Sequence, residues 1–245
     1  MSDNEPLPTI TTRYETELAV VRLVGPVTVP SILQLCDEID LAIGYYQYTR
    51  LDIELDSPGG DVAALEYLIT RWRAWRARPA VRIGTLALTS AASAAAMILS
   101  LGDIGLRRAY PSTRLLYHDA RLSTNAGMQT RAELAARQAM LNEIDTRLLD
   151  RLTAHVWHGI ESHDVQAPQC ALEAVLSYVD APRARVSTSS ARADGRDASS
   201  NSAFSSALVT NEIELRALYT QLNALDQFIP PAAARQLALI DTIVA

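Results

Sequence analysis

Lysine is missing from this chain of 245 residues, in which all 22 basic residues are arginine. The absence excludes catalysis through a lysine Schiff base or a Ser-Lys dyad. It also excludes a P-loop, in which a lysine contacts the phosphates of a nucleotide. A serine nucleophile in this chain would therefore need a base other than lysine.

Cysteine and long apolar runs are scarce as well. Cys36 and Cys170 are the two cysteines and lie far apart, so we expect neither a disulfide framework nor a metal-binding cluster. The longest apolar candidate, residues 91–101, is too short to span a membrane. Residues 1–6 are acidic and polar, unlike the start of a signal peptide. These features predict a cytoplasmic protein without a membrane partner.

The charge balance argues against a nucleic-acid partner. With 28 acidic and 22 basic residues, the formal net charge is −6 at pH 7, whereas nucleic-acid-binding proteins usually present a basic surface. Apolar residues make up 49% of the chain and charged residues 20%, as in ordinary globular proteins. The length allows one large domain or two small ones.

Strand patterns alternate with helical patterns along much of the chain. We expect strands at residues 18–23, 51–55, 81–87, 106–109 and 114–117, and helices at 32–43, from Asp61 to Pro79, at 129–155 and at 211–225. This alternation is typical of an α/β or α+β core with right-handed crossovers. Residues 181–206, rich in Ser, Arg, Asp and Gly, interrupt it and are predicted to be flexible.

Two backbone motifs have shapes that enzymes use. Ser57-Pro58-Gly59-Gly60 joins a predicted strand to a helix, and its glycines allow a sharp turn with free N–H groups that suit an anion. Ser93, flanked by alanines, begins another predicted helix, where backbone donors can stabilise an oxyanion. A plain tight turn and an N-capping serine are the simpler interpretations of these motifs.

Four histidines are candidates for a catalytic base. His118 ends a predicted apolar strand and would be held on a rigid element. His155, His158 and His163 cluster near the end of the long predicted helix, and their spacing fits no metal site, so we expect them to be solvated surface residues.

In sequence order, Ser57–Gly60, Thr89–Ser93 and Leu115–His118 resemble the proteolytic subunit of the Clp protease. His118 follows Ser93 by 25 positions, as in that family. The resemblance implies an α/β fold of the crotonase-like type, a spiral of ββα units with a long protruding "handle" helix. It also implies a serine endopeptidase that cleaves unfolded or extended polypeptides within an oligomeric chamber.

The resemblance assigns a role to each motif residue. Ser93 would be the nucleophile and His118 the base, with Asp226, which opens a motif resembling the family's aspartate segment, as the third member of the triad. The N–H groups of Gly60 and Ala94 would form the oxyanion hole. Asp164 and Asp180 are alternatives to Asp226. The substrate would lie against the turn residues and a strand near 120–127; the turn residues are Ser57, Pro58 and Gly59.

The resemblance also divides the chain and implies its partners. We expect an N-terminal leader (1–17), a core that includes the handle helix (18–160), a partly flexible insertion (161–210) and a C-terminal part of the core with the aspartate motif (211–245). The implied assembly is a homo-oligomer of stacked heptameric rings, served by an unfoldase ATPase of the AAA+ class. No cofactor or metal is implied.

Departures from the family pattern leave other functions open. Thr89 stands where the family has glycine, Ala94 replaces the methionine after the nucleophile, and the interval from Gly60 to Ser93 is about four residues longer than usual. One alternative is a phage-type capsid maturation protease of the same fold, and another is a catalytically silent structural subunit of a mixed Clp ring. An acyl-CoA enzyme of the related crotonase fold would not explain the spacing of Ser93 and His118.

Overall fold

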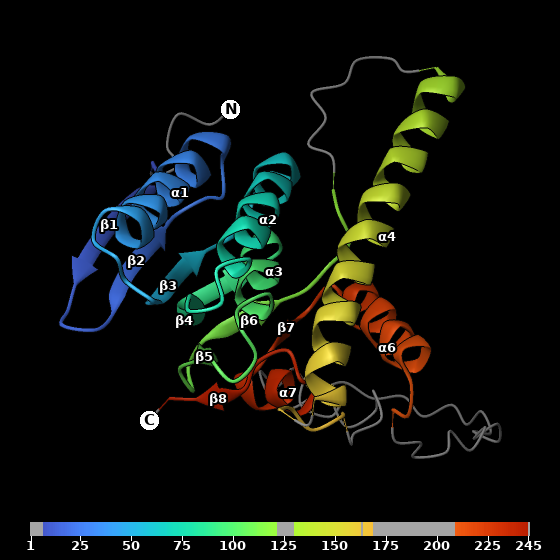
Figure 1. Cartoon of the computed structure of the whole chain (residues 1–245). Helices are drawn as coiled ribbons and strands as arrows, with labels where there is room; N and C mark the ends of the chain where they lie inside the picture. Colours follow the sequence, from blue (N-terminus) through green and yellow to red (C-terminus); the bar gives the residue numbers. More distant parts are fainter. Residues whose placement is uncertain (1–6, 122–129, 163, 169–208, 245) are drawn as a thin grey trace, which may run out of the picture.

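The chain folds around one mixed sheet, flanked by helices (Figure 1). The computed structural model describes residues 7–121, 130–162, 164–168 and 209–244. The strands are β1 (Thr9–Tyr14), β2 (Ala19–Val24), β3 (Arg50–Ser57), β4 (Arg82–Ala92), β5 (Arg107–Ala109), β6 (Arg114–Leu116), β7 (Phe228–Ile229) and β8 (Thr242–Ile243). The helices are α1 (Val29–Gly44), α2 (Val62–Arg76), α3 (Ala94–Ser100), α4 (Arg131–Glu161), α6 (Glu212–Leu225) and α7 (Pro231–Gln236). The predicted α/β class is therefore confirmed.

The sheet is mainly parallel and has the order β1-β2-β3-β4-β5-β8. Strand β4 is long enough to pair with two partners: residues 85–87 pair with β5, and residues 90–92 pair with β6. β6 in turn pairs with β7 in antiparallel register. This branching at β4 brings β6 alongside the last residues of β4.

Strand β3 is covered on both faces, although its alternation of apolar and acidic residues is typical of a strand with one solvated face. The apolar side chains of Leu51, Ile53 and Leu55 are fully buried in the core. On the opposite face, the carboxylates of Asp52 and Glu54 are nearly buried too, and each forms an ion pair with an arginine of a nearby strand. The acidic positions of this strand thus mark buried ion pairs and not a solvated face.

The N-termini of the first two long helices follow from local sequence. Thr28 and Ser31 form a capping box at the start of α1, and the side chain of Asp61 caps α2 by accepting the N–H of Ala63 at 2.7 Å. Such caps satisfy backbone donors that a helix leaves unpaired. Both helices follow strands directly, as the predicted strand-turn-helix order requires.

Strand β1 lies within the segment expected to be a leader. Its residues Thr9–Tyr14 pair in antiparallel register with β2 and form one edge of the sheet. The prediction of an insertion at 161–210 falls mostly on residues 169–208, which lie outside the described residues, as do His163, Cys170 and Asp180.

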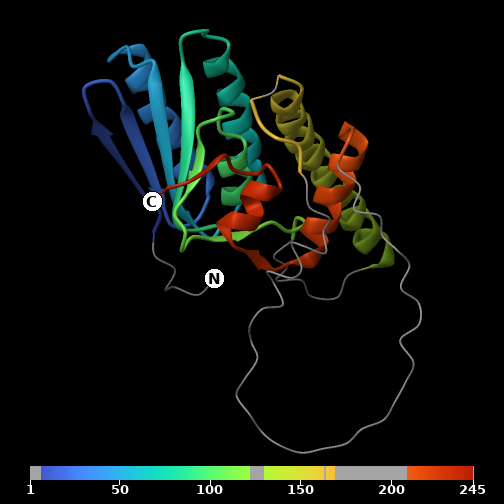
Figure 2. The same cartoon turned by 90° about the horizontal axis from the view of Figure 1, so that it is seen from below.

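Helix α4 is the longest helix of the described chain. Figures 1 and 2 show its C-terminal half beside α6 and its N-terminal half extending beyond the rest of the fold. Leu134 and Met140, in that N-terminal half, are more than half exposed. A long helix was predicted here, and its role as a handle between subunits stays a prediction. No helix among the described residues is long and apolar enough to cross a membrane.

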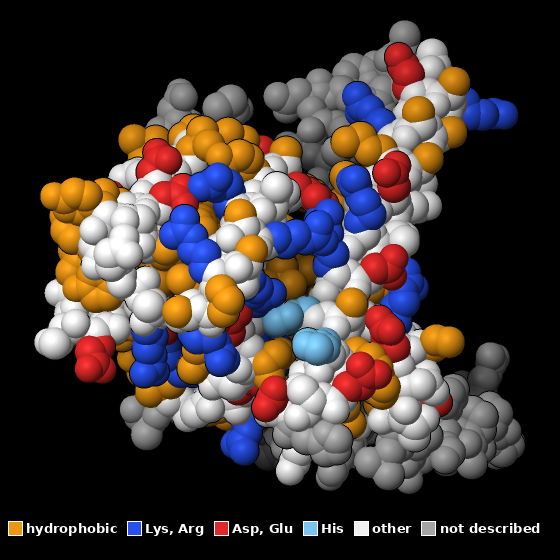
Figure 3. All heavy atoms as spheres, in the orientation of Figure 1, with side chains coloured by type: hydrophobic (Ala, Val, Ile, Leu, Met, Phe, Trp, Pro, Cys, Tyr) orange, Lys and Arg blue, Asp and Glu red, His pale blue; other side chains and the backbone are white. Residues whose placement is uncertain are grey.

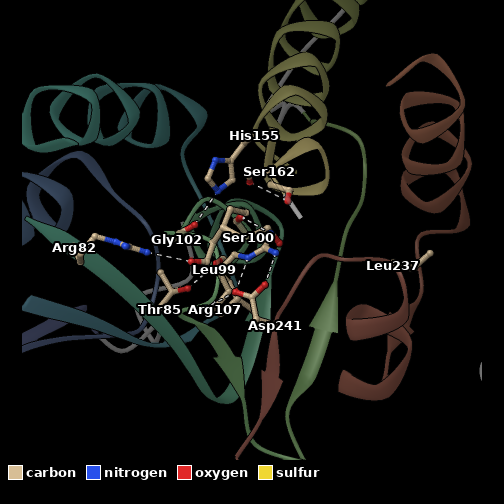
Figure 4. Close-up of polar contacts among 12 residues, drawn as sticks. Arg82, Thr85, Leu99, Ser100, Gly102, Arg107, His155, Ser162, Leu237 and Asp241 are labelled. Atoms are coloured by element: carbon tan, nitrogen blue, oxygen red, sulfur yellow. Dashed lines mark hydrogen bonds and ion pairs between the residues drawn. The ribbon is translucent and has the colours of Figure 1, made fainter. Parts of the chain in front are cut away.

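A polar network lies beneath the C-terminal half of α4 (Figure 4). At its centre the fully buried guanidinium of Arg107 pairs with Asp241, with Nη2 2.6 Å from Oδ1 and Nε 3.0 Å from Oδ2. The hydroxyls of Ser100 and Tyr117 share a buried hydrogen bond of 2.6 Å. These contacts join β5 to the residue before β8, and α3 to the residue before His118.

The prediction that His155 is a solvated surface residue is wrong. Its Nε2 lies 2.8 Å from the carbonyl oxygen of Gly102, below α4 (Figure 4). A carbonyl only accepts hydrogen bonds, so Nε2 carries the proton. Burial, helped by the charges of Arg76 and Arg107, lowers the pKa of His155 from 6.5 to about 4. The histidine is therefore neutral in the folded protein.

This lowered pKa predicts a loss of stability in mild acid. The unfolded chain takes up a proton on His155 near pH 6.5, whereas the folded chain takes it up only near pH 4. The contribution of neutral His155 to the free energy of unfolding is thus complete above pH 6.5 and is lost as the pH falls toward 4. At pH 5 the free energy of unfolding is lower by about 2 kcal/mol for this reason. Urea unfolding of the wild type and of His155→Gln at pH 7 and pH 5 measures it. An equally steep loss in the variant would contradict the prediction.

Candidate active site

Three strand ends bring the predicted site residues to one edge of the sheet. Ser57 of β3 pairs with Ala91 of β4, and Ala92 pairs with Leu116 of β6, all in parallel register. The N–H of Ser93 donates to the carbonyl of Leu116 at 2.8 Å. The carboxyl ends of parallel strands are where α/β folds usually place their ligands.

Ser93 has a strained backbone conformation. Its φ of 55° and ψ of −124° lie outside the regions that residues other than glycine normally occupy. Its side chain makes no capping hydrogen bond to α3, so the interpretation as an N-capping serine finds no support. Strain of this kind costs about 1–3 kcal/mol and clusters at functional sites. The sharp turn between β4 and α3 leaves the hydroxyl free for another role.

The Ser57–Gly60 turn packs directly against the Ser93 turn. Gly59 has a φ of +89°, and a Cβ there would lie 2.4 Å from the oxygen of Ala92 and 2.6 Å from the Cβ of Ser93. At Gly60 a Cβ would lie 2.1 Å from the oxygen of Val27. Both glycines are thus required by close backbone approach, and the two motifs found in the sequence form one unit.

Replacing Gly59 with alanine is expected to displace the nucleophile. The new methyl group overlaps backbone atoms of Ala92 and Ala94, which cannot rotate away as a flexible side chain could. We expect at least a hundredfold loss of activity, since misplacement by about 1 Å can cost that much. Gly105→Ala is the matched control, because Gly105 also has a positive φ but nothing within 4 Å of its Cβ position. Equal activities of the two variants would contradict this role of Gly59.

Two backbone donors near Ser93 are available. The N–H of Gly60 precedes α2, and the N–H of Ala94 opens α3. Within the described part of the chain neither donates a hydrogen bond. Unpaired N–H groups at helix starts are suited to stabilising a negatively charged oxygen.

His118 is held in a defined tautomer. Its Nδ1 lies 2.6 Å from the carbonyl oxygen of Asp119, and because a carbonyl cannot donate, Nδ1 must carry the proton. Nε2 is therefore the basic nitrogen, as proton transfer from a serine hydroxyl requires.

Ser93 and His118 share a small cavity of about 30 Å³. Its walls are mainly apolar and come from α2, α3, α4, α6 and the segment after β6. The lining includes Val62, Leu65, Ala94, Met97, Tyr117, Ala120, Asp145, Leu148, Leu149 and Asn223. The described structure thus brings the predicted nucleophile, the predicted base and one predicted oxyanion donor together.

Asp226 lies near this cavity but does not line it. It ends α6 with a left-handed backbone, φ 50°, and its half-exposed carboxylate forms an ion pair with Arg121. In the register of β6 with β7, Leu115 faces Ile229 and Leu116 faces Phe228. Continued by two residues, this register sets Asp226 opposite His118. The alternative Asp164 accepts the hydroxyl of Ser162 at 2.7 Å on the surface.

Asp145 is a site residue that the sequence interpretation did not identify. Its Oδ1 accepts the N–H of Ala120 at 2.6 Å. Burial raises the pKa of its carboxyl group above the ordinary value, although the Ala120 hydrogen bond acts in the opposite direction. Its position in the sequence could have revealed it. Asp145 precedes Leu148 by three residues and Leu149 by four, so its carboxylate lies on the apolar face of α4.

A larger cavity of about 360 Å³ lies between α2 and α4. Figure 3 shows arginine and histidine side chains gathered on this face between α2 and α4. Its lining comprises Ile69, Trp72, Arg73, Arg76, Leu101, Asp150, Arg151, Ala154 and His155, with no serine or cysteine nucleophile. Size alone therefore does not identify the reactive site.

The part of the chain that carries these strand ends also matches a known family. The model of the family described as "Clp protease" matches residues 19–167, more than half of the chain. The chain belongs to the Clp protease family. The match covers the three strand ends that carry Ser57, Ser93 and His118, and it stops before Asp226.

Two curated relatives in the Clp protease family come from Streptomyces. ATP-dependent Clp protease proteolytic subunit 4 of Streptomyces avermitilis is 31% identical over 111 residues, 45% of this chain and 46% of the relative. ATP-dependent Clp protease proteolytic subunit 2 of Streptomyces coelicolor is 29% identical over 131 residues, 52% of this chain and 57% of the relative. The chain thus matches about half the length of these relatives.

Proposed function

We propose that this protein is a serine endopeptidase that cleaves extended polypeptides. The observation that carries the proposal is the shared cavity of Ser93 and His118, with Ser93 on a strained turn and the proton of His118 on Nδ1. Ser93 attacks the scissile carbonyl, while Nε2 of His118 takes the hydroxyl proton and passes it to the leaving amine. A water molecule, deprotonated by the same nitrogen, then hydrolyses the acyl-enzyme and restores the Ser93 hydroxyl. Neither step needs a metal or cofactor from outside the chain.

The oxyanion of the tetrahedral intermediate would be stabilised by the N–H groups of Gly60 and Ala94. Their lack of other acceptors in the described chain supports this role, and one such donor contributes about 3 kcal/mol in other enzymes. The turn formed by Ser57, Pro58 and Gly59 would hold the substrate in extended form through backbone pairing. The second predicted substrate strand, near 120–127, lies mostly outside the described residues.

Asp226 remains the predicted third member of the triad. The register of β6 and β7 supports it, because its extension by two residues sets Asp226 opposite His118. In this role the carboxylate would stabilise the imidazolium that forms when Ser93 loses its proton.

The labelling of Ser93 by a fluorophosphonate probe tests the function directly. We expect the wild type to be labelled at Ser93 and His118→Ala to be labelled at least a hundredfold more slowly, because the hydroxyl then lacks its base. The labelling of Asp226→Ala is expected to be slowed less than that of His118→Ala. Absence of labelling in the wild type would overturn the proposal in favour of a catalytically silent ring subunit. Digestion of a capsid scaffold without an ATPase would favour the capsid maturation protease.

Assembly and partners follow from the same proposal. We infer a homo-oligomer of stacked rings, heptameric by analogy with the family, in which α4 contacts the opposite ring. An unfoldase ATPase would supply unfolded chains, since this chain has no P-loop lysine. Sedimentation that shows a monomer at micromolar concentration would contradict the assembly.

A further inference from the structure

One peptide group links the proposed base to a carboxylate of the long helix. The carbonyl of Asp119 accepts Nδ1–H of His118 at 2.6 Å. The N–H of Ala120, which belongs to the same peptide group, donates to Oδ1 of Asp145 at 2.6 Å. The peptide between residues 119 and 120 therefore stands between His118 and Asp145, with a short hydrogen bond on each side.

We propose that Asp145 is a positioning residue for His118, acting through the Asp119–Ala120 peptide. This inference rests on the proposed function of Ser93 and His118. The carboxylate fixes the orientation of the peptide plane, so that its carbonyl faces Nδ1. It also polarises the peptide, because hydrogen bonds in a chain strengthen one another. A more negative carbonyl oxygen holds a protonated imidazole more firmly.

The surroundings of Asp145 favour an electrostatic role over simple surface capping. The residue is only partly exposed and lines the same cavity as Ser93 and His118. A hydrogen bond to a charged acceptor is shorter and stronger than one between neutral groups. Apolar neighbours on α4, Leu148 and Leu149, limit the water that could otherwise screen the charge.

The other charged and titratable groups near His118 have different partners or surroundings. Asp119 is exposed and belongs to the same segment, Tyr117 is buried and paired with Ser100, and Arg121 is paired with Asp226. Among these described groups, Asp145 is the carboxylate whose hydrogen bond reaches the peptide that His118 contacts. Both Asp145 and Asp226 can therefore act on the base, by different routes.

The test separates hydrogen bonding from charge. Asp145→Asn keeps an acceptor for the Ala120 N–H but removes the charge, and Asp145→Ala removes both. The rate of Ser93 labelling by a fluorophosphonate is measured against pH for each variant. Asp150→Asn is the matched control, because Asp150 lies on the same helix and pairs with Arg216 on the surface.

We expect Asp145→Asn to lower the labelling rate about tenfold and Asp145→Ala about a hundredfold. We also expect the midpoint of the rate–pH curve to move to lower pH in both variants, since a protonated imidazole loses stabilisation. Asp150→Asn should match the wild type. A wild-type rate and midpoint in Asp145→Asn, with or without an effect of alanine, would overturn the charge-based role.

Failure of the proposed function gives a different result. In that case the wild type itself is not labelled, whatever residue stands at 145. An NMR titration of histidine-labelled protein, assigned with His118→Gln, then still reads the effect of Asp145→Asn on His118. No change in that titration would overturn the inference without reference to activity.

Discussion

Ser93→Ala is expected to abolish peptide hydrolysis while the protein still folds and assembles. Removal of the nucleophile in comparable hydrolases lowers the rate constant of catalysis by about 10⁴- to 10⁶-fold. The fold should tolerate the change, since the Ser93 side chain forms no capping bond and alanine retains the Cβ that contacts the glycine turn. Hydrolysis of a fluorogenic peptide, together with thermal unfolding and sedimentation, measures both halves of the expectation.

Ser90→Ala is the matched control for this experiment. Ser90 lies on β4, three residues before Ser93, and its backbone N–H donates to Asp56 independently of its side chain. We expect wild-type hydrolysis from this variant. Retained hydrolysis in Ser93→Ala would refute the mechanism, and loss in both variants would point to damage of β4 instead.

Asp241→Asn is expected to destabilise the protein by about 3–5 kcal/mol, the usual cost of breaking a buried ion pair. The reason is that Arg107 is fully buried and would keep its charge without a counterion. Urea unfolding measures the free energy of unfolding. The double variant Arg107→Met/Asp241→Leu should recover most of the loss, because it removes both charges and fills the site with apolar groups.

The surface ion pair of Arg216 with Asp150 provides the comparison. Both side chains are substantially exposed, so Asp150→Asn should change stability by less than about 1 kcal/mol. Similar losses of stability in Asp150→Asn and Asp241→Asn would contradict the claim that burial makes the Arg107–Asp241 pair costly to break. Failure of the double variant to recover stability would show that the network contributes more than charge balance.

The sequence predicted the local backbone features of the candidate site, and the roles of its residues stay predictions. Ser57–Gly60 and Ser93 are recognisable because the backbone geometry they require depends on neighbouring residues: glycines for the close approach and alanines around the strained serine. His118 was predicted as the end of a strand, and the parallel pairing of β4 with β6 brings it to Ser93. Sequence pattern and spacing are enough to predict a turn or a strand end, because the geometry of such a feature depends on neighbouring residues.

Other features depend on which distant segments meet, and the sequence does not reveal that. Asp145 acts on the site only because α4 packs over residue 120, 25 positions earlier. His155 looked like a surface residue because its partner is the carbonyl of Gly102 and not a neighbouring side chain. Strand β1 was missed because its Thr-rich run has little apolar content and gains its pairing from β2.

The close contact at Gly59 has a mechanical consequence. Because the space beside Gly59 is too small even for a Cβ, the glycine turn cannot shift toward the Ala92–Ala94 backbone without displacing the nucleophile turn as well. Both proposed oxyanion donors, at Gly60 and Ala94, adjoin that contact. A motion that pushes the glycine turn toward Ser93 would therefore displace Ser93 and both proposed donors together, so that the proposed site would lose its alignment in a single step and not by degrees.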